Sequence, residues 1–86
     1  KERIIEHWIH FRTEEDKTAY WEHIRQSGFE LAREEKTDNP EFPYKLCISR
    51  SDKASEATID SVVMSLWELA QQVNAEYDGW ETSIMK

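Results

Sequence analysis

Three histidines and one cysteine are the side chains best suited to metal binding or nucleophilic catalysis. A zinc or iron site needs several such ligands converging in a fixed geometry. His7 and His10 are an odd number of residues apart in an extended segment, so they fall on opposite faces of a strand. We expect one histidine to pack against the core and the others to be solvated, with no metal and no cofactor. The four residues are His7, His10, His23 and Cys47.

Cys47 could act as a nucleophile if a histidine base lay within hydrogen-bond reach. His10 is the candidate base because both residues fall on the same predicted face of neighbouring strands. A free cysteine in a strand is more commonly a small packing residue, so this small-enzyme hypothesis is the weakest alternative. Acidic pairs such as Glu14-Glu15 and Glu34-Glu35 lie in charged runs that water normally solvates, whereas a general acid needs a desolvated pocket. We expect a protein that is not an enzyme.

Length limits the number of domains, and charge limits the classes of partner. A chain of 86 residues supports one core, which predicts one domain over residues 1–86. The formal charge of −7, from 18 acidic and 11 basic residues, opposes direct binding to nucleic acid or to an anionic membrane and attracts basic protein segments. The single cysteine and the lack of an apolar run of about 20 residues favour the cytoplasm. The chain begins at Lys1 rather than at Met, which is compatible with a longer parent protein.

Alternating hydropathy over residues 4–11 predicts a first strand whose odd positions face the core, because the opposite choice would bury Glu6. Thr13 and the acidic residues after it predict the start of a helix, and Gly28 is placed to end it in a left-handed conformation. A short strand over residues 29–32 follows. The charged stretch from Arg33 to Lys36 then leads into a proline-containing loop.

The second half of the chain repeats this order. Residues 44–49 alternate as a third strand and residues 51–55 form a polar connection. Apolar residues at three- and four-residue steps from Ile59 to Val73 predict a helix that stops at Asn74. A last strand is expected over residues 76–84.

The resulting order, β-α-β-β-α-β, predicts an α+β protein with a ferredoxin-like arrangement. Both helices should cover one face of a four-stranded antiparallel sheet, with the strands in spatial order 4-1-3-2. The four tryptophans cannot all fit in so small a core, so some must be partly exposed, either covering the core edge or anchoring a protein partner. They are Trp8, Trp21, Trp67 and Trp80.

Two segments resemble a known family. The string IDxxVxxLxxLA from Ile59 to Ala70, followed by EYDGW over residues 76–80, resembles the RraB family, the regulators of ribonuclease activity B. Ile5-Glu6-His7 before an acidic helix start, and Gly28 after that helix, are also similar. The resemblance implies a ferredoxin-like regulator that inhibits ribonuclease E by binding its non-catalytic C-terminal region, without an active site or cofactor.

Acidic and aromatic residues of the first and last predicted strands are the candidate partner-binding residues. Gly79 could permit a bulge or a close backbone approach. A structural role and a binding role are therefore both alternatives for the YDGW segment. An alternative function is a sensory or oligomerisation module of a longer protein, whose open sheet face pairs with a second copy. The candidate residues are Glu6, Trp8, His10, Tyr77, Asp78 and Trp80.

Overall fold

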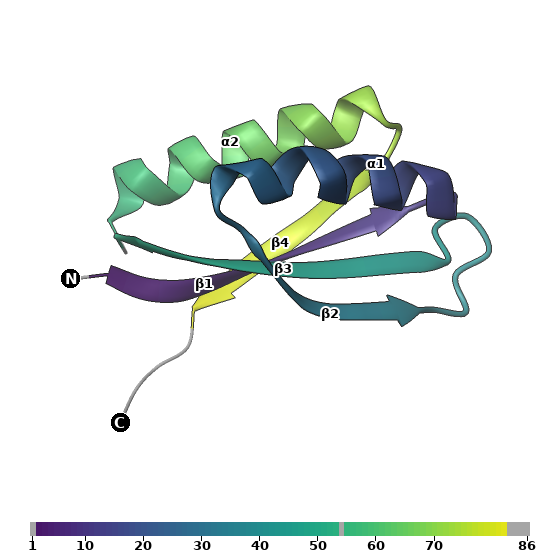
Figure 1. Ribbon diagram of the computed structural model, residues 1–86, viewed down its shortest axis with the longest axis horizontal. Coiled ribbons are helices and arrows are strands. Elements are labelled where there is room, and N and C mark those ends of the chain that lie inside the picture. Colours follow the sequence, from purple (N-terminus) through teal and green to yellow (C-terminus); the bar gives the residue numbers. More distant parts are fainter. Residues whose placement is uncertain (1, 54, 83–86) are drawn as a thin grey trace.

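The computed structural model describes residues 2–53 and 55–82, in which two helices lie across one face of a four-stranded antiparallel sheet (Figure 1). The strands lie in the order β2-β3-β1-β4, which is the predicted order read from the other edge. The predicted ferredoxin-like element order is therefore confirmed. The elements are β1 (Glu2–Phe11), α1 (Glu14–Ile24), a 3-10 turn (Arg25–Ser27), β2 (Glu30–Lys36), β3 (Tyr44–Lys53), α2 (Glu56–Gln72) and β4 (Glu76–Thr82).

The central strand β1 has the predicted alternation. Its odd residues Ile5, His7, Ile9 and Phe11 are buried against the helices. The strand pairs antiparallel with β3 along its whole length and with β4 on its other side. Because β3 and β4 both pair with β1, the residues of β1 that face the helices determine which side of the whole sheet faces them.

Helix α1 begins as predicted. The Thr13 hydroxyl accepts a hydrogen bond of 3.1 Å from the backbone N–H of Asp16, and three acidic residues occupy the first turn. Both features stabilise a helix N-terminus. The chain then tightens into the 3-10 turn, and Gly28 ends it with a φ of 90°. The predicted left-handed glycine is therefore confirmed.

The predicted ends of β2 and β3 were wrong. The charged stretch from Arg33 to Lys36 is not a loop, because it pairs with the start of β3 and belongs to β2. All seven residues of β2 are exposed, so this edge strand has no buried side to impose an alternating pattern on its sequence. Likewise Ser51 to Lys53 continue β3 opposite β1, whereas a polar connection was expected. The last strand ends at Thr82, and the predicted residues 83 and 84 lie outside the described residues.

Helix α2 starts three residues earlier than its apolar pattern, at Glu56. The Ser55 hydroxyl accepts a hydrogen bond from the backbone N–H of Thr58, which satisfies an otherwise unpaired donor of the first turn. At the other end, Asn74 adopts a φ of 57°, which accounts for the predicted stop.

The core lies between the sheet and the two helices. Phe11 and Tyr20 pack edge to face with ring centroids 5.2 Å apart. The Tyr20 hydroxyl donates a hydrogen bond of 3.1 Å to the backbone carbonyl of Leu66 and so ties α1 to α2. Trp67 and Trp80 are 47% and 42% exposed, which confirms that some tryptophans lie at the surface.

Leu66 and Met64 on α2 offer a matched test of this core. Leu66 is 1% exposed and Met64 is 58% exposed. We expect Leu66→Ala to lower the free energy of unfolding by about 2 to 5 kcal/mol, because it leaves a cavity beneath the helix. Met64→Ala should change it by less than about 0.5 kcal/mol. Urea unfolding followed by circular dichroism measures both, and equal effects would contradict this placement of α2.

Candidate protein-binding surface

The face of the sheet that the helices leave uncovered carries a mixed set of charged and aromatic side chains, which we call the open face. It is built from the even residues of β1 and from the residues directly opposite them, since paired residues of antiparallel strands share a face. Its members include Glu6, Trp8 and His10 of β1, Lys45, Cys47 and Ser49 of β3, Glu30, Arg33 and Glu35 of β2, and Glu76, Asp78 and Glu81 of β4.

Trp8 lies at the middle of the open face. It is directly opposite Cys47 on one side and Gly79 on the other. The Lys45 ammonium lies 4.6 Å from the centroid of the indole ring, a cation–π arrangement. Trp8 is partly exposed although no helix covers it.

Cys47 is 1% exposed even though it lies on the open face. Burial, followed by the nearby Glu6 carboxylate, raises the pKa of the Cys47 thiol to about 11. A thiol with so high a pKa is a poor nucleophile at neutral pH. His10 does share the face with Cys47, but it stands opposite Lys45. The chemistry of the pair therefore does not favour the cysteine-histidine enzyme hypothesis.

His10 is held by the YDGW segment. Its Nε2 lies 3.3 Å from Oδ2 of Asp78. The pairing of β1 and β4 shifts by one residue between Trp8 and Ile9, so that Asp78 is the extra residue of a bulge beside Gly79. Gly79 has a φ of 148°, and no heavy atom lies within 4 Å of the position its Cβ would take. The predicted bulge is confirmed, whereas the suggested close backbone approach is wrong.

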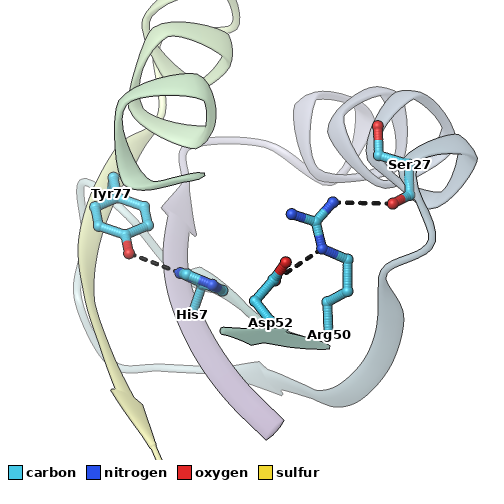
Figure 2. A network of polar contacts seen from close by, with 5 residues as sticks. All are labelled: His7, Ser27, Arg50, Asp52 and Tyr77. Carbon is cyan, nitrogen blue, oxygen red and sulfur yellow. Dashed lines mark hydrogen bonds and ion pairs between the residues drawn. The ribbon is translucent and has the colours of Figure 1, made fainter. Parts of the chain in front are cut away.

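Tyr77 and Trp80 lie on the other side of the sheet. Tyr77 stands opposite Ile9, and Trp80 stands opposite the buried His7. A hydrogen bond of 2.8 Å joins the Tyr77 hydroxyl to Nδ1 of His7 (Figure 2). Of the six candidate partner-binding residues, the open face thus brings together Glu6, Trp8, His10 and Asp78, and Tyr77 and Trp80 face the helices. Their role in binding stays a prediction.

A polar network lies beneath the helices, on the side away from the open face (Figure 2). Nε of Arg50 donates a hydrogen bond of 2.8 Å to Asp52, and Nη1 donates one of 3.0 Å to the carbonyl of Ser27. The guanidinium also lies 4.3 Å from the centroid of the Phe29 ring. These contacts fasten the end of β3 to the turn that follows α1. Sequence reasoning missed them because it took residues 51–55 as a polar connection, although Asp52 keeps the parity of the buried Ile48.

His7 is 1% exposed, and its Nε2 has no hydrogen-bond partner among the described residues. Burial is the main reason why the pKa of His7 is lowered to about 4. The Asp52 carboxylate raises this pKa, and the Arg50 guanidinium lowers it. The predicted arrangement of one core histidine is confirmed, since His23 is exposed and His10 is on the open face.

Within residues 2–53 and 55–82, no group of three or more histidine, cysteine and acidic side chains could hold a metal ion. No helix in this part of the chain is both long and apolar enough to span a membrane.

The reactivity of Cys47 tests whether neighbouring side chains of the open face shield its thiol from solvent. A pKa of about 11 instead of 9.0 gives about 100-fold less thiolate at pH 8. We expect a thiol reagent to label folded protein at least about 100-fold more slowly than protein unfolded in urea. Trp8→Ala should accelerate labelling of the folded protein, while Trp67→Ala on α2 should leave the rate unchanged. Fast labelling of the unmodified protein would contradict the buried thiol.

The pH dependence of stability tests the neutral state of His7. Its pKa is lower in the folded chain than its ordinary value of 6.5, so acidification from about pH 6.5 to pH 4 favours the unfolded, protonated state. The two pKa values correspond to a loss of about 3 kcal/mol over this window. We expect His7→Gln to remove this part of the pH dependence of the free energy of unfolding. His23→Gln should retain it, and parallel curves for the His7 variant and the unmodified protein would refute the assignment.

Comparison with known protein families identifies a family over most of the chain. The model of the RraB family, described as regulator of ribonuclease activity B, matches residues 1–82. The search of curated proteins finds no match. Family membership implies a non-enzymatic regulator of ribonuclease E activity. Since the match spans nearly the whole sequence, from β1 to β4, the chain belongs to the RraB family.

Proposed function

We propose that the protein modulates ribonuclease E by binding a basic segment of that enzyme's non-catalytic C-terminal region on the open face. The regulator acts by occupying this segment and thereby changing which other proteins can reach it. No bond of the partner is made or broken. Support comes from the family match and from the charges on the sheet.

The observation that carries this proposal is the placement of Glu6 directly opposite Glu81. The two carboxylates belong to neighbouring strands and share the open face. Like charges in this position destabilise a sheet, so the pair has a cost that a bound Arg or Lys would relieve. Asp78 on the same strand adds a third acid close to the half-buried Trp8.

Trp8 supplies the second part of the proposed recognition. Lys45 already lies over the indole, which shows that the ring can carry a cation on its face. An arginine of the partner could stack on the same aromatic surface while its guanidinium approaches Glu6 or Glu81. The buried aromatic area gives affinity, and the acids select a basic partner.

Charge reversal on the open face tests this proposal. We expect Glu6→Lys or Glu81→Lys to weaken binding to the C-terminal region of ribonuclease E about tenfold at low salt, which corresponds to about 1.4 kcal/mol. Glu68→Lys is the matched control because Glu68 is an exposed residue of α2 with the same charge. Isothermal titration calorimetry at two salt concentrations measures the affinities, and binding should weaken as salt rises.

Two results would count against the proposal. Absence of measurable affinity at low salt would remove ribonuclease E as the partner. Equal weakening by the open-face variants and by Glu68→Lys would show that only the net charge matters, and the open face would then not be the binding surface. The proposal also implies that the protein works in the cytoplasm, as the lone Cys47 led us to expect.

A further inference from the structure

Strand β2 forms one edge of the sheet (Figure 1). All seven of its residues are exposed. Among the described residues, β3 is the strand that pairs with it, on its inner side. On the outer side of such a strand, every second residue directs its backbone N–H and C=O away from the sheet. Those groups can accept another extended segment as an additional strand.

A pocket of about 190 Å³ lies beside this edge, between β2 and α1. It is lined by Lys17, Thr18, Trp21, Leu31, Glu34 and Leu46. Leu31 of β2 is 42% exposed at its rim, and the buried Leu46 contributes apolar surface. The ion pair between Lys17 and Glu34 spans from α1 to β2. An apolar pocket bounded by a fixed ion pair suits one aliphatic side chain.

The opposite side of the same edge is charged. Glu30 stands opposite Ser49 and Glu35 stands opposite Lys45, so both carboxylates project on the side of the open face, with Arg33 between them. Both residues are exposed. Because side chains alternate along an extended segment, a strand added to β2 would direct alternate residues into the pocket and toward these acids.

We propose that the β2 edge binds an extended protein segment in which aliphatic and basic residues alternate, and that this segment adds a fifth strand to the sheet. The proposal rests on the proposed function in taking the partner to be a basic protein segment. It adds the conformation of that segment and the residues that recognise it. A second copy fits less well, because each chain carries a formal charge of −7 and two copies repel each other.

A model peptide tests strand addition directly. The probe is a seven-residue peptide of alternating arginine and valine, capped at both ends and added to the full chain. We expect slower hydrogen exchange at backbone amides of Glu30–Lys36 in the bound protein, measured by NMR. The same peptide methylated at every backbone nitrogen keeps its side chains but cannot donate strand hydrogen bonds. It should bind at least about tenfold more weakly, and equal binding would overturn the proposal.

Matched variants test the pocket. We expect Leu31→Arg to weaken binding of the unmethylated peptide about tenfold, because it places a like charge where the aliphatic side chain should enter. Met64→Arg adds the same charge at an exposed apolar position of α2 and should change the affinity less than about twofold. Equal effects of the two variants, or peptide-induced protection confined to β1 and β4, would overturn the assignment to β2. Dimerisation of the chain through the same amides would also overturn it in favour of a second copy.

The two proposals fail in different ways. If ribonuclease E binds to the open face alone, Glu6→Lys weakens that complex whereas Leu31→Arg leaves it unchanged. If the enzyme is not the partner, the alternating peptide still protects β2. The affinities of both variants for both ligands therefore answer two questions separately, namely which surface binds and whether ribonuclease E is the partner.

Discussion

The inward alternation of β1 is the constraint on which the rest of the molecule depends. Ile5, Ile9 and Phe11 must face the helices to build the core, and the pleat then places Glu6, Trp8 and His10 on the other face. Since β1 pairs with both β3 and β4, a slip of one residue would expose the apolar side chains and bury acids. Burial of one face thus creates the charged face as a necessary result.

The polar groups beneath the helices show how a small core accommodates ionisable residues. His7 stays neutral and bonds to Tyr77, while Arg50 is partnered by Asp52 and by a backbone carbonyl. The contacts of His7 with Tyr77 and of Arg50 with Ser27 join segments that are distant in the sequence. A buried polar side chain costs free energy unless it finds a partner, so these bonds favour one arrangement of strands and helices over others. The two surfaces proposed for binding both rest on this single arrangement.

Local signals were enough to predict the order of the elements, the side of β1 that faces the core and the start of α1 at Thr13. These features follow from periodicity and capping, which operate over a few residues. The length of β2 could not be predicted in this way, because its pairing with β3 stabilises an edge strand that has no buried residue. The Lys17–Glu34 ion pair also depends on the folded arrangement, since its members come from α1 and β2. Four of the candidate binding residues share the open face, namely Glu6, Trp8, His10 and Asp78, whereas sequence reasoning could not place Tyr77 and Trp80 on the opposite face.

The pairing of β1 with β4 has a consequence for when the protein becomes competent during synthesis. His7 and Tyr77 are in hydrogen-bond contact although 70 residues separate them. A nascent chain that still lacks β4 has neither Asp78 nor Glu81, and one side of its central strand is unpaired. The acids that β4 contributes to the open face therefore join it only after β1 to β3 have been made, and a chain shortened before β4 lacks them.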